Sequence, residues 1–553
     1  MSADWHRARA SLERDPATAP ELILVARQLT EAGHPDRALL LAREAAEHAM
    51  GDDRDEARLV AGASAVGAGY AVEAATWLGT LYPHGGERHR WAGLGALIVA
   101  QTYVQGTVPE VDPTTVRPGT ADGVDWRHWT RATALAAILC AERGDRRGMR
   151  VWLDALRDGA ALIGAEQDLR DPVVALSWLI AGDRDIHDVT AAGSVSGGLL
   201  RTLRAAEEGD IDLALRLLVT EESTFSGEPD PFVPGYEHSP VVQAYRAIVE
   251  VLLLVWRGDI GLARDALIRA ALTLPIAVPF AGLGVVLARR LDLAVLGTLG
   301  PFSRALTIVL PPGTKIDQLV DRGVQAFLAG SFDDAAATVR LWSDLGAPQT
   351  AISVPGLDEL AAVAPDCLPA AASVEPPEIA LARQLRERIA TAGEGRWRVE
   401  SDEVAEIART LRSPFERGRV EAMLGARHAI RDDHAAARIH LQYAERLFEL
   451  AGAMAWAKAI RGRLDRLEAR EGSIVPAVGA LSACRSDWSR RLTARELEVA
   501  MCAVRGAANR EIGEVLNVSI RTVEVHLGRI FAKLDVRSRV ELTVLAHRTE
   551  LHL

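Results

Sequence analysis

The sequence predicts an all-α protein in which an irregular helical solenoid precedes a small four-helix domain. Apolar residues recur at three- and four-residue spacing through nearly all of residues 1–470, as in Leu441, Ala444, Leu447 and Phe448. This period is typical of amphipathic helices, and alternating runs of the strand kind are scarce. The composition of the 553 residues, 49% apolar and 25% charged, is that of a globular protein.

A recurring corner predicts helical hairpins. A helix ends in Gly, a polar turn follows, and Ala lies five residues after the Gly, in residues 33–38, 209–214, 258–263 and 330–335. We call each of these a Gly–Ala corner. Gly favours the left-handed conformation that closes one helix, Asp begins the next, and the small Ala lets two antiparallel helices approach closely.

Related turns occur at Gly144, and at Asp432 and Asp433 before Ala436. The corners resemble those of tetratricopeptide-like repeats. The five glycines are spaced by 111, 65, 49 and 72 residues, whereas such repeats have a steady period of about 34. We therefore expect an irregular tetratricopeptide-like solenoid.

Stretches rich in Pro and Gly predict the domain boundaries. Residues 109–118 and 229–240 interrupt the body, and six prolines in residues 346–377 exclude a continuous long helix there. Residues 471–487 have the Gly, Ser and Pro content of a linker. We expect a first lobe at 1–345, a Pro-rich connection at 346–376, a second lobe at 377–470, a linker at 471–487 and a C-terminal domain at 488–553.

Signatures of catalysis, cofactors and metals are missing. Gly313-Thr314-Lys315 has no glycine five residues before Gly313, so no phosphate-binding loop for ATP is present, and Val195 stands where residues 193–197 would need a nucleophilic serine. The four cysteines form no C-x-x-C pair, and the acidic cluster of Asp52, Asp53, Asp55 and Glu56 lacks calcium-loop spacing. We expect no enzyme activity, no cofactor and no metal site.

The lack of export and membrane signals favours a cytoplasmic protein, and the distribution of charge indicates that one end of it binds a polyanion. Residues 1–14 lack a signal peptide's apolar stretch, and Pro275 and Pro279 interrupt the apolar residues 270–288, so we expect no membrane segment. Residues 488–553 hold 11 basic against 8 acidic residues, a net charge of +3, and the remaining residues hold 52 against 67, a net charge of −15. The basic end is therefore the part expected to meet a polyanion.

The C-terminal domain divides into four short helices. Thr493 and Glu496 have the spacing of a capping box at the start of the first helix, which runs to about Val504 and ends at Gly506. A second helix at 509–516, a tight turn at 517–519 capped by Ser519, and a third helix at 520–534 follow. Helix, short turn and helix form the helix-turn-helix arrangement. A fourth helix is expected from about 538 to 548.

The third helix has two different faces. At about 100° per residue, Val523, Leu527, Ile530 and Leu534 form its buried stripe. The opposite face, with a glycine and an alanine, suits close approach to base edges in a major groove. We expect the base-facing residues to be Arg521, Glu524, Val525 and Gly528. The alternative is a charged amphipathic helix that packs on the solenoid.

Hydroxyl, amide and basic groups around this face are expected to contact phosphates. Thr522, His526, Arg529 and Lys533 lie along one flank of the third helix. The complete set of expected phosphate contacts is Thr493, Asn509, Arg510, Ser519, Thr522, His526, Arg529, Lys533 and Arg537.

The domain resembles the C-terminal DNA-binding domain of LuxR-type bacterial transcriptional regulators. The matching motifs are T-x-R-E at 493–496, N-R-E-I at 509–512, S-x-R-T-V at 519–523, V-x-V-H at 523–526 and K-L-x-V-x-S-R at 533–539. The resemblance implies pairing through the fourth helix, where we expect Val540, Val544 and Leu545 to contribute. Gly513 departs from the usual Ala, which would loosen the second helix. Glu524 replaces a basic residue of some members, so no base preference carries over.

Residues 435–470 are similar to the last helical repeat of the large LuxR regulators. Those regulators carry an N-terminal ATPase whose loop is missing here, so ATP-driven switching is not expected. Patterns of a phosphoacceptor receiver domain or an autoinducer pocket are also missing. The solenoid is then the input module, and its tryptophans either line a ligand groove or form core: Trp77, Trp91, Trp126, Trp129, Trp152, Trp178, Trp256 and Trp342.

These observations predict a sequence-specific DNA-binding transcriptional regulator. Its expected partners are double-stranded promoter DNA, a second copy of the chain on DNA, RNA polymerase, and an effector or protein partner for the solenoid. We expect it in the cytoplasm, and at the nucleoid when it is bound to DNA. The alternative function is a helical-repeat scaffold whose C-terminal domain mainly mediates protein contacts.

Overall fold

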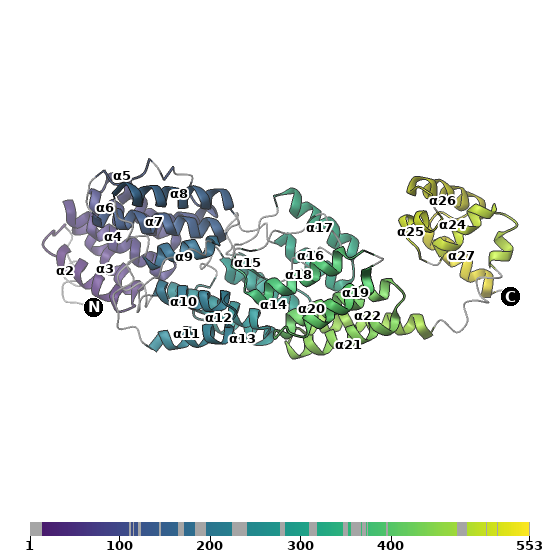
Figure 1. Ribbon diagram of the computed structural model, residues 1–553. Coiled ribbons are helices and arrows are strands. Elements are labelled where there is room, and N and C mark those ends of the chain that lie inside the picture. Colours follow the sequence, from purple (N-terminus) through teal and green to yellow (C-terminus); the bar gives the residue numbers. More distant parts are fainter. Residues whose placement is uncertain are drawn as a thin grey trace. The chain divides into compact units, whose positions relative to one another are not determined.

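A computed structural model describes most of the chain (Figure 1). The described residues are 14–109, 123–142, 145–163, 171–182, 195–223, 240–276, 282–308, 318–346, 374–393, 396–472 and 484–551 without 505 and 517, together with a few residues between these ranges. Within them the named elements are all α-helices, and the pairing of Ile352 with Val374 is an isolated bridge. The all-α prediction is confirmed.

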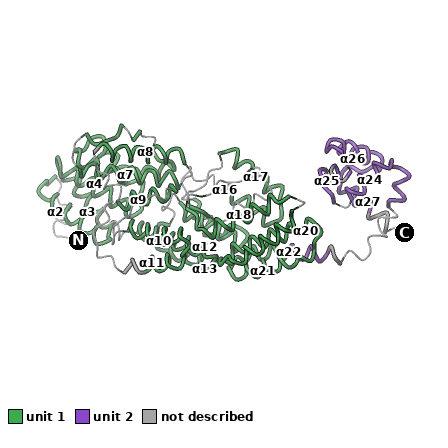
Figure 2. The backbone as a smooth tube through the Cα atoms, in the orientation of Figure 1, with its two compact units in different colours: residues 1–462 green, residues 463–553 purple. Residues whose placement is uncertain are grey.

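The chain forms two compact units, residues 1–462 and 463–553 (Figure 2). In the first part of unit 1, most helices pack against the next one along the chain. These helices are α2 (Ala19–Glu31), α3 (Pro35–His48), α4 (Gly51–Ala68), α5 (Ala71–His84), α6 (Glu87–Gln105), α7 (Gly123–Glu142), α8 (Arg146–Ile163), α9 (Pro172–Ala181), α10 (Val195–Glu207) and α11 (Ile211–Ser223).

The second part of unit 1 continues this arrangement. Its helices are α12 (Pro240–Arg257), α13 (Ile260–Ala271), α14 (Leu283–Leu296), α15 (Pro301–Ile308), α16 (Gln318–Ala329), α17 (Phe332–Asp344), α18 (Pro377–Thr391), α19 (Trp397–Ala408), α20 (Pro414–Ile430), α21 (His434–Leu450) and α22 (Met454–Gly472), and α22 continues past residue 462 into unit 2.

Contacts join helices from both sides of the Pro-rich stretch within unit 1. The backbone N–H of Gly261 donates to the Ala451 carbonyl at 3.0 Å, and the Phe327 ring centroid lies 6.2 Å from that of Trp456. The division into two lobes stays a prediction.

The Gly–Ala corners have the predicted geometry. Gly33, Gly209, Gly258 and Gly330 all have positive φ angles, between 77° and 95°. The alanines five residues later are completely buried, and they are Ala38, Ala214, Ala263 and Ala335. The small side chain of these alanines therefore lets the paired helices pack closely. The turn at Gly144 lies outside the described residues.

Asp begins the second helix of a corner in some cases and not in others. Asp210 Oδ1 accepts from the Leu213 N–H at 2.8 Å, and Asp433 Oδ1 accepts from the Ala436 N–H at 3.2 Å. Asp259 makes no such cap, because its carboxylate pairs with the Arg257 guanidinium instead. Ion pairing replaces capping at that corner.

Most of the tryptophans expected in a groove or in the core lie in the core. Trp91, Trp126, Trp129, Trp152, Trp256 and Trp342 are each at most 7% exposed. Trp77 and Trp178 are partly exposed, and the Arg157 guanidinium lies 4.7 Å from the Trp178 ring centroid. Six of the eight therefore serve packing.

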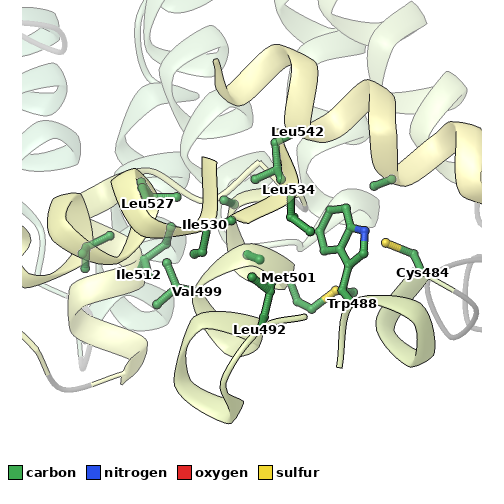
Figure 3. Packing of buried hydrophobic residues seen from close by; sticks show 14 residues of the cluster. Cys484, Trp488, Leu492, Val499, Met501, Ile512, Leu527, Ile530, Leu534 and Leu542 are labelled. Carbon is green, nitrogen blue, oxygen red and sulfur yellow. The ribbon is translucent and has the colours of Figure 1, made fainter. Parts of the chain in front are cut away.

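Unit 2 has its own hydrophobic core. Its helices beyond the end of α22 are α24 (Ala494–Val504), α25 (Asn509–Leu516), α26 (Ile520–Leu534) and α27 (Arg539–Leu551), preceded by a short helical turn at residues 484–488. The bounds of α24, α25 and α26 are those predicted. Figure 3 shows Trp488 in the core cluster with Cys484, Leu534 and Leu542. The core of unit 2 therefore includes Cys484, which lies four residues before the expected domain start.

No helix among the described residues is long and apolar enough to cross a membrane.

Candidate nucleic-acid interface

Helix α26 presents one apolar face to the core of unit 2 and one face to solvent. Val523, Leu527, Ile530 and Leu534 are its buried residues, which confirms the predicted stripe. Ser519 caps the helix, because its Oγ accepts from the Thr522 N–H at 3.1 Å. The cap and the stripe together fix how the helix is rotated against the domain.

All four residues expected to face bases are exposed on α26. Arg521, Glu524 and Gly528 are exposed, and the Val525 side chain is 49% exposed. A Cβ atom added at Gly528 would meet no atom within 4 Å beyond the adjacent residues and the nearby backbone of α26 itself. The face therefore combines two charged side chains with the small apolar side chain of Val525 and the bare backbone of Gly528, which another molecule can approach closely.

The residues expected to contact phosphates lie on α24, α25, α26 and the segments before and after them. Thr493, Arg510, Ser519, Arg529, Lys533 and Arg537 are exposed, and Asn509, Thr522 and His526 are partly buried. Asn509 is the first residue of α25, and the Ala508 N–H just before it donates to Glu511 Oε2 at 2.6 Å. The structure thus leaves these groups at the surface of one small domain.

Lys533 and Glu496 form an ion pair between α26 and the start of α24. The Lys533 ammonium lies 2.6 Å from Glu496 Oε2, which also accepts from the N–H and the hydroxyl of Thr493 at 2.9 and 2.8 Å. The Thr493 hydroxyl in turn receives the Glu496 N–H at 3.4 Å, so the predicted capping box is confirmed. These donors, the Lys533 ammonium first, lower the pKa of the buried Glu496 carboxyl to about 2.

Lys533 keeps donors for another partner. An ammonium group has three donors, and the Lys533 side chain is 40% exposed. Glu496 therefore holds the group in place without enclosing it.

Two arginines to which the sequence analysis assigned no role make contacts that connect helices of the domain. Arg495 donates to Glu498 at 2.8 Å and to the Leu516 carbonyl, which connects α24 to the end of α25. Arg539 donates to the Ala503 carbonyl at 3.1 Å, to the Ala507 carbonyl, and to Asn509 Oδ1 at 3.5 Å. Both belong to the matched motifs, but the motifs alone do not show what each guanidinium contacts.

Gly513 has a steric role that the sequence did not show. A Cβ atom at this position would lie 2.8 Å from the Val518 carbonyl oxygen, and the Val518 N–H donates to the Gly513 carbonyl at 2.9 Å. Glycine therefore allows Val518, in the tight turn between α25 and α26, to lie close against the backbone of α25. The loosening of α25 expected from Gly513 stays a prediction.

The residues expected to pair two copies divide between surface and core. Val540 and Val544 on α27 are 73% and 46% exposed. Leu545 packs against the core of the domain, next to the fully buried Leu542. An apolar strip on α27 is therefore available to a partner, formed by the two valines.

Comparison with known proteins places a family match on this domain. Residues 490–546 match the family model described as bacterial regulatory proteins, luxR family. This segment contains α24, α25, α26 and most of α27. The family-level resemblance expected from the motifs is thus confirmed for this domain.

Curated relatives match the same end of the chain. The transcriptional regulatory protein LiaR of Bacillus subtilis strain 168 is 47% identical over 60 residues, which are 11% of this chain and 28% of LiaR. The nitrate/nitrite response regulator protein NarP of Escherichia coli K12 is 48% identical over 54 residues, 10% of this chain and 25% of NarP. The chain therefore spans about a quarter of the length of these relatives.

A solved structure aligns with more of the chain. The crystal structure of yeast Tom70 covers 84% of this chain and 91% of its own, at 12% sequence identity and a TM-score of 0.25.

Proposed function

We propose that the chain is a sequence-specific DNA-binding transcriptional regulator that reads promoter DNA with α26. The observation that carries the proposal is the exposed face of α26, with Arg521, Glu524, Val525 and Gly528 on a helix whose opposite side is locked into the core. An α-helix fits the major groove, where Arg pairs with guanine and Glu accepts from cytosine N4. The match of residues 490–546 to the luxR family model supports the same function.

The phosphate contacts in this proposal are Thr493, Asn509, Arg510, Ser519, Thr522, His526, Arg529, Lys533 and Arg537. Such contacts set the register of the helix on the duplex, and base contacts supply the specificity. Two copies of the domain, paired through Val540 and Val544, double the number of base pairs read.

Unit 1 is proposed to set the activity of the domain, through an effector, a partner protein or self-association. We place the protein in the cytoplasm and at the nucleoid when bound to DNA, with RNA polymerase as a further contact. If unit 1 gates DNA binding, the full chain and the fragment 484–553 differ in DNA affinity by about 1–3 kcal/mol, the usual size of a coupling energy. If the full chain and the fragment 484–553 have equal DNA affinities, both with and without added fractions of cell extract, unit 1 does not gate DNA binding.

The test of DNA binding is a gel shift of the full chain against sheared genomic DNA, followed by sequencing of the bound fragments. The proposal expects enrichment of a shared site, and it expects that the Arg521→Ala variant loses the enrichment while keeping its fold. The scaffold function would be supported instead if no DNA sequence is enriched and if wild type and Arg521→Ala capture the same proteins from a cell extract.

A further inference from the structure

Arg539 lies at a corner where three helices of unit 2 meet. It is the first residue of α27, and its guanidinium reaches the end of α24 and the start of α25. Nη2 donates to the carbonyls of Ala503 and Ala507, and Nη1 donates to Oδ1 of Asn509. One planar group therefore serves two backbone acceptors and one side-chain acceptor, which a lysine ammonium cannot do with the same fixed geometry.

The contact with Asn509 decides which atom of its carboxamide faces Arg539. A carboxamide has one acceptor oxygen and one donor NH₂ group, and a guanidinium only donates. Arg539 therefore selects the orientation in which Oδ1 faces its guanidinium, at 3.5 Å from Nη1, and this orientation leaves the NH₂ group for another acceptor. A phosphate oxygen accepts hydrogen bonds and donates none, so the NH₂ end is the one that a DNA backbone requires.

We propose that Arg539 is a positioning residue for DNA binding, which acts through Asn509 and through the corner between α24 and α25. It orients the Asn509 carboxamide toward phosphate and holds the first residues of α25 in place. Its own guanidinium is used by the three acceptors of the corner and does not contact DNA. This inference rests on the proposed DNA-binding function.

A direct contact of Arg539 with phosphate predicts a different salt dependence. Each phosphate neutralised by a basic side chain contributes about 0.9 to the slope of log K against log salt. Removing a residue that only positions Asn509 lowers the affinity and leaves this slope unchanged. Removing a basic residue that touches phosphate lowers both the affinity and the slope, whereas removing a neutral residue such as Asn509 lowers the affinity alone.

The experiment measures binding of the full chain to a labelled 30-bp duplex of mixed sequence between about 50 and 200 mM salt, the range over which phosphate contacts dominate. The variants are Arg539→Met, Asn509→Ala and the double variant, with circular dichroism to establish that each is folded. Arg491→Met is the matched control, because Arg491 is exposed on the same domain and its loss changes the net charge equally.

We expect Arg539→Met and Asn509→Ala each to weaken binding by about tenfold, the size of one hydrogen bond to a charged group. Their double variant is expected to bind no more weakly than Arg539→Met alone, with an unchanged slope in all three. Additive losses in the double variant, or a slope lower by about 0.9 in Arg539→Met, would overturn the inference. Failure of the wild type to bind the duplex would overturn the proposed function itself.

Asn509→Asp tests the same inference if Arg539→Met does not fold. An aspartate keeps an acceptor for Arg539 and suits the first turn of a helix, but it offers phosphate no donor. We expect this variant to be as stable as the wild type and to bind the duplex more than tenfold more weakly. Affinity equal to that of Arg491→Met would contradict the assigned role of the carboxamide.

Discussion

The ammonium group of Lys533, near the end of α26, lies 2.6 Å from Oε2 of Glu496, in the first turn of α24. The pair connects the end of the candidate recognition helix to the N-terminus of another helix. Because Glu496 is buried and Lys533 is 40% exposed, removing the lysine leaves a buried carboxylate with fewer donors. Removing the carboxylate instead frees the ammonium group toward solvent.

The first prediction concerns pH. The pKa of Glu496, about 2 in the folded protein, lies below the value of about 4.3 usual for glutamate. Its contribution to stability is therefore fully present above about pH 5 and is lost as the pH falls toward 2. We expect Glu496→Gln to lower the free energy of unfolding at pH 7 and to flatten its decline between pH 5 and 2.

The measurement is urea unfolding of the fragment 484–553, followed by fluorescence of Trp488, the single tryptophan of that fragment. Glu498→Gln is the control, because Glu498 pairs with Arg495 at the surface. Parallel stability curves for wild type and Glu496→Gln across this pH window would contradict the prediction.

The second prediction concerns the salt dependence of DNA binding. Arg529→Met and Lys533→Met are each expected to reduce the slope of log K against log salt by roughly 1, because each residue is proposed to neutralise one phosphate. Fluorescence anisotropy at several salt concentrations gives the slope. Unchanged slopes in both variants, with Arg491→Met as the reference, would remove these residues from the interface.

The third prediction concerns specificity. Arg521→Ala and Glu524→Ala are each expected to cost about 1–3 kcal/mol on the preferred site and little on random DNA, because base contacts are lost and phosphate contacts are kept. Competition binding with the site found by genomic enrichment measures both affinities. Equal losses of affinity for the preferred site and for random DNA would show that these side chains contact the DNA backbone.

The fourth prediction compares two glycines in helices of the same domain. Gly528→Ala is expected to raise the stability by about 1 kcal/mol, because alanine favours helix and the position is open. It should weaken binding to the preferred site, since a methyl group is added to the face proposed to meet bases.

Gly513→Ala has the same gain in helix propensity but a Cβ atom 2.8 Å from the Val518 carbonyl oxygen. We expect a net loss of about 1–3 kcal/mol, typical of an overpacked position. Thermal unfolding of the two variants beside wild type checks both signs. Stabilisation by Gly513→Ala would mean that the turn before α26 relaxes freely.

The fifth prediction concerns pairing. Val540→Glu and Val544→Glu are expected to change domain stability by less than about 0.5 kcal/mol, because both side chains are exposed. They should abolish the assembly of two copies on one DNA site. Sedimentation of the DNA complex gives the stoichiometry, and a wild-type complex with one protein per site would refute the dimer.

Sequence periodicity was sufficient to predict the fold class and the helices of the C-terminal domain. The stripe Val523, Leu527, Ile530 and Leu534 predicted which side of α26 is buried, because a helix fixes the angular positions of its own residues. The caps at Thr493 and Ser519 were predictable for the same reason, since each cap involves residues only three apart. Burial of Ala38 and its equivalents followed from the local chemistry of the Gly–Ala corners.

Contacts between distant residues needed the tertiary structure. Lys533 and Glu496 are 37 residues apart, and Arg539 reaches acceptors 30 to 36 residues before it. The steric role of Gly513 depends on the path of the following turn, and the inclusion of Cys484 in the core depends on how residues 484–488 fold back. Periodicity and capping act within one or two helical turns, so the sequence alone determined the helices and their buried faces. The partners of Lys533 and Arg539 were decided by the way those helices pack, which brings together groups that no local pattern relates.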